Sequence, residues 1–447
     1  MNNIHILRKK LIKIKSNYIN KLHKAGVDIS LSSLSSFRPL NFSNFGKRPY
    51  QIKLKNIEKK INLINFIYQV KNFLYILRFS SPQIFGNYSK KNINNYKTLI
   101  VSWSTEKDFL KTGEYFDKYF KISSKKKDTL WFLVHMGNEK PKKIKKNIII
   151  FYNPQKKNGF NINLLIKYFF KIIRQKKFSL SKIYHELSFD SFIAHNMKDF
   201  FAKVLVYYWP KKIIFPYECQ TFQSSLIHLI RKSNEKIITI GYNHSSHPFP
   251  MYNLYHSNSP DLLYVQSEAS KKFFSKYFKW PQKKVKQISS LLVKKTAKEY
   301  AKKIFLPYGF SDANVVVKNF ELFVNSYLQE KIKPMKIKTH PATINSKRHL
   351  ELKKRIEHII KINKNKFSEN SNKSTSIHIG EVSTVIEALE AGVTAIHIVC
   401  DPIFELYSPK FWPSIKVRQL SDKIFEYSLK EFGKCLTFEK KKFLHDI

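Results

Sequence analysis

Between residues 98 and 399 the sequence alternates short apolar runs with segments of helical periodicity. The runs TLIVSW, TLWFLVH, NIIIFY, KIIFPYE, KIITIGY and LLYVQS fall within residues 98–267, and KKIFLPYG, MKIKTHP, TSIHIG and TAIHIV fall within residues 302–399. Near-continuous apolar, β-branched runs of this length are typical of strands buried on both faces of a parallel sheet. Their alternation with helical segments predicts an α/β fold built from βαβ units.

The length of the chain indicates more than one domain. A chain of 447 residues exceeds one ordinary core and fits two. We predict two Rossmann-like, doubly wound domains over residues 96–295 and 296–447, with the boundary near residues 285–302. Residues 1–95 are rich in Lys, Asn and Ser and contain one long helical pattern at 52–79, which predicts a basic, helical N-terminal extension. The apolar stripe of that pattern is interpreted as a packing face, with a membrane-surface helix as the alternative.

The charge of the chain is strongly one-sided. Its 81 Lys and Arg residues against 32 Asp and Glu give a formal net charge of +49. A field of this size attracts anions, which include nucleic acid, an anionic lipid surface and phosphorylated substrates. The abundance of Lys, Asn and Ile is also what an AT-rich genome produces without any selection for binding. Apolar residues make up 43% of the chain, so the charges decorate a folded protein.

The cysteines and the N-terminus predict the compartment. Cys219, Cys400 and Cys435 are scattered and form no CxxC pair, which favours a reducing compartment over a disulfide framework or a zinc site. The first 24 residues lack a continuous apolar core and a cleavage site, and no stretch of the sequence reaches about 18 uninterrupted apolar residues. We therefore predict a cytoplasmic protein that contacts membranes only at the inner face, as a peripheral protein.

The stretch SIHIGEVSTVIEALEAGV, residues 376–393, places a glycine and a Ser-Thr pair between an apolar run and a short helix. Gly380 ends the predicted strand, and Ser383 or Thr384 is the candidate N-cap. Ligands of open α/β sheets bind at the carboxyl ends of the strands, where exposed N–H groups of a helix start favour phosphate. This predicts a nucleotide phosphate at the two hydroxyl residues, with Glu387 reaching ribose hydroxyls. The alternative is an ordinary capped helix with that glutamate on a solvated face.

A second segment, KIKTHPATINS, ends a predicted strand in polar residues. Lys338 and His340 come at the strand end, and Pro341 forces the chain to turn. An ammonium and an imidazole placed at the same sheet edge as Gly380 can both donate hydrogen bonds to phosphate oxygens. A structural histidine is the alternative.

These segments carry a resemblance to a known family. KTHP, followed some forty residues later by GEVST and EALEAG, resembles the nucleotide-sugar-binding half of GT-B glycosyltransferases, in particular bacterial capsule and lipopolysaccharide transferases. LIVSWSTEKDFLKTGEYFDKYF, FPYECQTFQSSLIHLIRK, IGYNHSSHPF and SPDLLYVQSEASKKFF resemble surface-carbohydrate biosynthesis proteins, and the likeness runs from about residue 98 to about 420. The resemblance implies that His340 contacts the donor phosphate, that Ser383 and Thr384 bind the same phosphate, and that Glu387 faces the nucleotide.

Acidic residues of the amino half supply candidates for the catalytic base. An inverting transferase needs a carboxylate or a histidine to accept the proton of the acceptor hydroxyl. Asp108 is the first choice, with Glu106 and Glu114 as neighbours in the loop after the first strong strand. Glu218 follows the strand KIIFPY and is a further candidate, beside Gln220, which suits hydrogen bonds to sugar hydroxyls. The alternative is that these acids are surface residues or helix caps.

The segment GYNHSSHPFPMYNLYHSNSPD contains histidines 244, 247 and 256. It has no helical His pair with a Glu and no nearby Cys, so we interpret it as a ligand-contacting loop that uses His244 and Ser245. DxD-like acidic clusters are also missing from the sequence, which favours a metal-independent enzyme.

The function predicted from the sequence is transfer of a sugar from a nucleotide donor to a cell-surface polysaccharide or lipid-linked glycan acceptor. The pairing of the HP and serine motifs favours a CMP-linked ulosonic or nonulosonic sugar. No cofactor is expected, and an anionic membrane surface is an expected partner. One alternative is a glycerophospho- or polyol-phosphate transferase of teichoic-acid type. The other is a non-enzymatic nucleic-acid-binding protein, although aromatic-interleaved basic RNA motifs are missing from the sequence.

Overall fold

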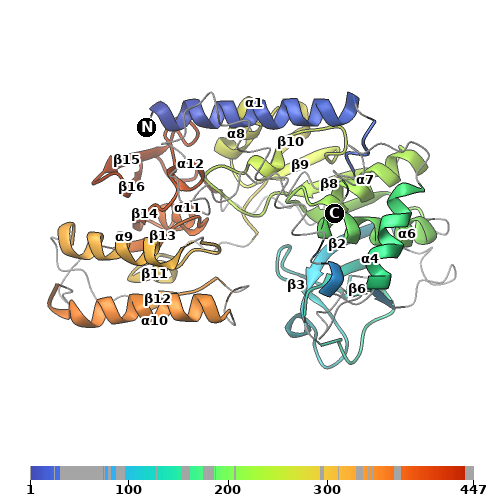
Figure 1. The fold of residues 1–447 in the computed structure, drawn as a ribbon, viewed down its shortest axis with the longest axis horizontal. Coiled ribbons are helices and arrows are strands. Elements are labelled where there is room, and N and C mark those ends of the chain that lie inside the picture. Colours follow the sequence, from blue (N-terminus) through green and yellow to red (C-terminus); the bar gives the residue numbers. More distant parts are fainter. Residues whose placement is uncertain are drawn as a thin grey trace.

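The structure is a computed structural model with two large, parallel-rich sheets (Figure 1). It describes residues 2–24, 26–30, 74, 76–78, 82–86, 96–126, 128–137, 139–152, 162–174, 186, 188–205, 208–291, 296–310, 312–328, 336–340, 343, 346–366 and 374–437. Helices pack on both sheets, so the α/β prediction is confirmed as a mixed α/β architecture. None of the helices within these residues combines the length and the apolar character needed to cross a bilayer.

The first sheet has the strand order β1-β6-β5-β2-β7-β8-β9-β10. From β6 to β10 the neighbouring strands are parallel, and β1 is antiparallel to β6. Every residue of β2, β5 and β6 is buried, as their continuous apolar runs predict. The strands are β1 (Gln83–Phe85), β2 (Thr98–Ser104), β5 (Thr129–His135), β6 (Ile148–Tyr152), β7 (Lys212–Pro216), β8 (Ile238–Tyr242), β9 (Leu262–Val265) and β10 (Val285–Gln287).

The two faces of the first sheet are covered differently. One face shares its core with α4 (Ile162–Ile173), α6 (Phe189–Leu205), α7 (Thr221–Ser233) and α8 (Glu268–Tyr277). The other face packs on the segment 109–124, which contains a hairpin of β3 (Phe116–Asp117) and β4 (Ile122–Ser123). There, Tyr115 and Phe120 share a buried apolar cluster with Ile100 and Trp131. The link from β2 to β5, which the sequence predicted as a loop, thus contains this hairpin.

The second sheet has the order β12-β11-β13-β14-β16-β15 and helices on both faces. β11, β12, β13 and β14 are parallel, while β16 pairs antiparallel with β14 and β15. Its elements are β11 (Lys303–Phe305), α9 (Ala313–Ser326), β12 (Lys336–Lys338), α10 (Lys347–Ile362), β13 (Thr375–Ile379), α11 (Thr384–Glu390), β14 (Thr394–Ile398), α12 (Pro402–Glu405), β15 (Ile415–Gln419) and β16 (Ile424–Leu429). The change from the first sheet to the second lies between β10 and β11.

Short 3-10 turns complete the described elements. They are η4 (Ile76–Arg78), η5 (Glu106–Asp108), η6 (Met251–Asn253), η7 (Gln282–Lys284), η8 (Ala297–Glu299) and η10 (Lys364–Lys366). The helix predicted at residues 52–79 lies outside the described residues, apart from residue 74 and η4. The strand β1 comes from the segment predicted as an extension, and it belongs to the first sheet.

The N-terminal helix α1 (Asn2–Lys24) lies across both halves of the molecule (Figure 1). The buried Arg8 donates hydrogen bonds to the carbonyls of Ile403 and Leu406, both at 2.6 Å, at the end of α12. The buried Lys15 donates to the carbonyl of Met251 at 2.9 Å, in the first half. Buried charges need such partners because their desolvation is costly. The helix therefore ties the two sheets together.

Candidate active site

The predicted site residues come after the carboxyl ends of strands. Within each sheet these strands are parallel, so their carboxyl ends lie at one edge of that sheet. In the first sheet Glu106 follows β2, Glu218 follows β7 and His244 follows β8. In the second sheet His340 follows β12 and Gly380 follows β13. Parallel pairing places the ends of neighbouring strands together, which is where α/β sheets bind ligands.

A carboxylate and an imidazole meet at the ends of β7 and β8. The Nε2 atom of His244 lies 3.4 Å from Oε1 of Glu218, and Oε2 of the same carboxylate accepts a hydrogen bond from Gln220 at 3.0 Å. The His244 side chain is 11% exposed and that of Glu218 is 30% exposed, so the pair is shielded but reachable. The ring of His244 also lies 4.7 Å from the ring of Tyr119, measured between the centres.

Two polar atoms beside this pair have no partner. Within the described part of the chain, neither Nδ1 of His244 nor Oγ of Ser245 makes a hydrogen bond, and both atoms are buried from solvent. A buried polar group left without a hydrogen bond costs about 1–3 kcal/mol. Native proteins keep few such groups, and those that remain call for an explanation such as a ligand. The position next to His244 and Ser245 is therefore suited to a bound polar molecule.

Tyr119 and Lys118 come from the hairpin that covers the first sheet, and the sequence interpretation missed both. Burial, and then the carboxylates of Glu218 and Asp117, raise the pKa of Tyr119, so its hydroxyl stays neutral. Lys118 is exposed, and its ammonium lies 5.4 Å from the centre of the Tyr119 ring. Two-residue strands such as β3 and β4 leave no periodicity to detect, and therefore only a structure places these residues at the site.

His340 faces the strand ends of the first sheet. Its ring lies 4.9 Å from that of Tyr308, an exposed residue that follows β11. Burial first, and then the positive charges of His247 and Lys118, lower the pKa of His340, while Glu218 raises it in part. Three charged or titratable groups of the first half, on His247, Lys118 and Glu218, thus influence the pKa of His340. Tyr308 was also missed, although its place directly after a predicted strand is a usable signal.

The loops after β8 and β13 are in direct contact. Oε1 of Glu381 lies 3.5 Å from Nδ1 of His247, and the hydroxyl of Tyr407 lies 2.8 and 2.9 Å from the carbonyls of Ser246 and Val382. Glu381 of the loop after β13 thus faces a histidine of the loop after β8. These contacts hold the strand ends of the two sheets next to each other.

Ser383, Thr384 and Glu387 make internal hydrogen bonds. The Ser383 hydroxyl donates to Oε1 of Glu387 at 3.2 Å, and Oε2 of that glutamate accepts from Tyr300 at 3.1 Å. The Thr384 hydroxyl lies 2.9 Å from Nδ1 of the buried His378. Burial raises the pKa of Glu387. The predicted contacts of these side chains with a nucleotide stay predictions, because in the structure each is engaged inside the protein.

Gly380 occupies a position that only glycine fits. Its φ of +70° lies in the left-handed region, and a Cβ added there would lie 2.8 Å from Cβ of Pro307. The Gly380 carbonyl accepts a hydrogen bond from the buried His397 at 2.7 Å. The residue thus shapes the turn after β13, and no described contact assigns it to a ligand.

The three acids after β2 have different environments. Oδ2 of Asp108 accepts hydrogen bonds from the N–H of Thr105 at 2.7 Å and from its hydroxyl at 3.0 Å, which is the cap that the sequence offered as the alternative. Glu114 lies 3.5 Å from Lys125 and 4.0 Å from Lys145. Oε2 of Glu106 is buried and finds no hydrogen-bond partner among the described residues. The choice of Asp108 as the base stays a prediction. Its hydrogen bonds with Thr105 do not favour that role, because they already engage Oδ2 of the carboxylate.

The three histidines of the loop after β8 point to different partners. His244 faces Glu218, His247 faces Glu381, and the buried His256 lies 3.2 Å from Sγ of Cys219. Across the residues that the structure describes, no group of three or more His, Cys, Asp or Glu side chains is arranged to hold a metal ion. Metal independence stays a prediction.

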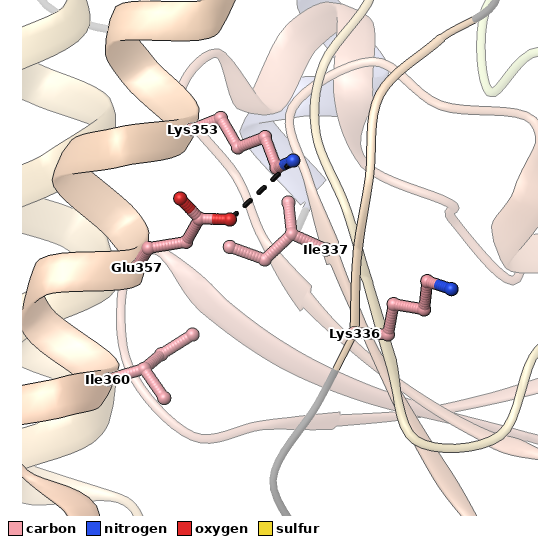
Figure 2. Close-up of a pocket in the computed structure, with 5 residues that line it drawn as sticks. All are labelled: Lys336, Ile337, Lys353, Glu357 and Ile360. Carbon is pink, nitrogen blue, oxygen red and sulfur yellow. Dashed lines mark ion pairs between the residues drawn. The ribbon is translucent and has the colours of Figure 1, made fainter.

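A separate depression of about 320 Å³ lies between β12 and α10 (Figure 2). It is lined by Lys336, Ile337, Lys353, Glu357 and Ile360, and Lys353 lies 3.6 Å from Glu357. None of the predicted site residues lines it. The exposed Lys338 is two positions further along β12, and Pro341 lies outside the described residues.

Comparisons with known proteins give one structural match. No model of a protein family matches the chain, and no curated protein matches it. The crystal structure of a glycosyltransferase from Rickettsia africae ESF-5 is similar at 14% identity and a TM-score of 0.32, over 71% of this chain and 88% of that chain. This TM-score is too low to establish a common fold, and the proposals below are independent of it.

Proposed function

We propose that the protein is a glycosyltransferase of GT-B type that uses a nucleotide sugar. The observation that carries the proposal is the pair of unsatisfied atoms at His244 and Ser245, beside a carboxylate and close to the strand ends of the second sheet. The motifs around His340 and Ser383 resemble those of the donor-binding half of such enzymes. A sugar, with its many hydroxyls, is the class of ligand that satisfies an imidazole nitrogen and a hydroxyl together.

His244 is the preferred base in this proposal. The carboxylate of Glu218 favours the tautomer with the proton on Nε2, which leaves a lone pair on Nδ1. In the transfer step the acceptor oxygen bonds to the anomeric carbon, and its proton passes to Nδ1. The bond between that carbon and the phosphate oxygen breaks, and the nucleotide leaves with the electron pair. Glu218 then stabilises the imidazolium, as the carboxylate of a catalytic triad does.

The leaving phosphate is assigned to donors from both halves: the ammonium groups of Lys338 and Lys118 and the N–H of the neutral His340 imidazole. His340 and Lys338 follow or end β12, and Lys118 of the hairpin acts on the same imidazole. Hydrogen bonds from cationic groups to phosphate oxygens are roughly twice as strong as neutral ones. Placing positive charge where negative charge develops is commonly a large term in catalysis.

The proposal is tested by nucleotide-sugar binding. Purified protein is incubated with UDP-, GDP- and CMP-linked sugars and with the free nucleotides, and its thermal midpoint is recorded. We expect one nucleotide class to raise the midpoint and the His340→Ala variant to lose most of that rise. A matched variant, His358→Ala on the exposed side of α10, keeps it. No stabilisation by any nucleotide would remove the donor site and the proposed function with it.

A further inference from the structure

Helix α4 presents a row of large apolar side chains to solvent. Ile162, Ile166, Phe169 and Phe170 are 59%, 44%, 37% and 52% exposed. Spacings of four, three and one residues place them on one face of the helix. Single exposed apolar residues are ordinary, but four on one face form a patch of the kind that marks an interaction site.

The opposite face of α4 is anchored in the protein. Tyr168 and Ile172 are buried, and the Tyr168 hydroxyl donates to the carbonyl of Glu186 at 2.6 Å. The Tyr168 ring also contacts the ring of Phe192 on α6, with 5.2 Å between the centres. Figure 1 shows α4 beside α6 on the outside of the first half. The helix is therefore held in place, and the apolar row is its outer surface.

The charged residues of the surrounding sequence are all basic. Residues 140–185 contain 13 Lys and Arg residues and no Asp or Glu. Of these, Lys167 is exposed on α4 itself, and Arg174 is exposed directly after its end. Helix α4 thus combines an outward apolar face with a neighbouring sequence rich in cations.

We propose that α4 is the surface through which the protein docks on an anionic lipid bilayer. A helix with aromatic and aliphatic side chains on one face and cations beside it lies in the bilayer interface, with the apolar face among the acyl chains. Cations near the surface of an anionic leaflet strengthen this binding through electrostatic attraction. A second copy of the chain is disfavoured, because two such basic surfaces repel each other. RNA would engage the cations and leave the apolar row uncovered.

This inference deepens the proposed function, because a lipid-linked acceptor would lie at the same surface. The docking itself requires no transfer activity. The two can therefore fail separately, and the experiment below measures both.

The test is flotation of the full chain with vesicles. Vesicles of phosphatidylglycerol and phosphatidylcholine are compared with phosphatidylcholine alone, at low and at high salt. The Ile162→Ser, Phe170→Ser double variant is compared with Val315→Ser, Leu322→Ser, which removes two residues of α9 that are each 41% exposed. We expect the α4 variant to bind the anionic vesicles at least tenfold more weakly and the α9 variant to bind as the unchanged protein does. A Lys167→Glu variant is expected to weaken binding by a smaller factor, and only at low salt.

Three results would overturn the inference: no binding of the unchanged chain to anionic vesicles, equal binding by the α4 variant, or a loss that the α9 variant shares. Sedimentation velocity identifies the second-copy case, in which the α4 substitutions dissociate a dimer and leave vesicle binding intact. RNA binding that competes with the vesicles and is insensitive to the α4 substitutions would indicate nucleic acid instead. The nucleotide thermal shift of the α4 variant is expected to be unchanged, which separates this inference from the donor site.

Discussion

The strand ends of the two sheets look alike in sequence, but their polar groups differ in the structure. After β7 and β8, His244 and Ser245 keep buried polar atoms without partners beside Glu218. After β13, the hydroxyls of Ser383 and Thr384 are engaged with Glu387 and His378. The first region keeps polar atoms unpaired within the described residues, as the proposed ligand site requires, whereas the side chains of the second are engaged within the fold. Substitutions in the first should therefore change turnover, and substitutions in the second should mainly change stability.

The largest expected effect is that of His244→Ala on turnover. Loss of a general base lowers rates by roughly 10²–10⁴-fold. We expect kcat for sugar transfer to fall by that factor with little change in the nucleotide thermal shift, because His244 lies in the first half. The measurement is release of the nucleotide under saturating donor.

The matched control for this prediction comes from the second region. Thr384→Ser keeps the hydroxyl that faces His378 and is expected to leave kcat within about twofold, because it preserves a neutral hydrogen bond worth about 1 kcal/mol. Normal turnover by His244→Ala would return the role of base to Glu106 or Glu218. It would also show that the unpaired Nδ1 atom of His244 has no role in catalysis.

The next effect is on stability, and Gly380→Ala produces it. Alanine at a φ of +70° costs about 1–2 kcal/mol, and the contact of its Cβ with Pro307 adds to this. We expect the free energy of unfolding to fall by about 2–3 kcal/mol in a urea titration. Gly392→Ala is the matched control, since it has a φ of +80° and no described atom within 4 Å of the added Cβ, so only the backbone cost of about 1–2 kcal/mol is expected there. Equal losses in the two variants would show that the turn after β13 is not tightly packed.

The sequence predicted the elements whose burial depends on local pattern. The strands β2, β5 and β6 were readable because every residue in them is buried and all except His135 are apolar or small. The cap formed by Asp108 was offered as an alternative because its partner Thr105 is only three residues away. The closeness of Glu218 and His244 was implicit in the prediction that consecutive strands end at one edge.

What the sequence did not predict depends on contacts between distant residues. The direction of the Thr384 hydroxyl is set by His378, whose ring stacks on that of Phe305 from a neighbouring strand, with 4.9 Å between the centres. Tyr119 reaches the site on a hairpin within the segment that the sequence predicted only as a loop. The exposure of α4 depends on which face Tyr168 and Ile172 bury. None of these has a sequence period that a single chain reveals.

A further effect concerns how the free energy of unfolding depends on pH. It arises from two buried carboxyl groups after β14, those of Asp401 and Glu405. Burial raises the pKa of Asp401 to about 7, and burial and then Asp401 raise the pKa of Glu405 to about 8, from ordinary values of 3.8 and 4.5. The folded protein therefore holds protons that the unfolded chain releases, so the free energy of unfolding falls as the pH rises from about 4 to about 8. Glu405→Gln keeps an oxygen for the Cys400 N–H and does not titrate.

We expect this variant to lose about 3 kcal/mol less between pH 5 and pH 8 than the unchanged protein does, as measured by urea unfolding at each pH. Substitution of the exposed Glu235 by Gln is the control and should leave the slope unchanged. A slope that Glu405→Gln does not reduce would show that the carboxylate is already ionised in the folded state.

The smallest expected effect decides whether the second region is closed in solution. In Ser383→Ala the hydroxyl that donates to Glu387 is lost, which removes one hydrogen bond worth about 1 kcal/mol from the fold. Because that hydroxyl is engaged inside the protein, we expect KM for the nucleotide sugar to change less than about threefold, or about 0.6 kcal/mol. A tenfold rise in KM at constant kcat would mean that the Ser383 hydroxyl leaves Glu387 and binds the donor, as the family resemblance implies. The two regions would then form one site that closes when the donor is absent.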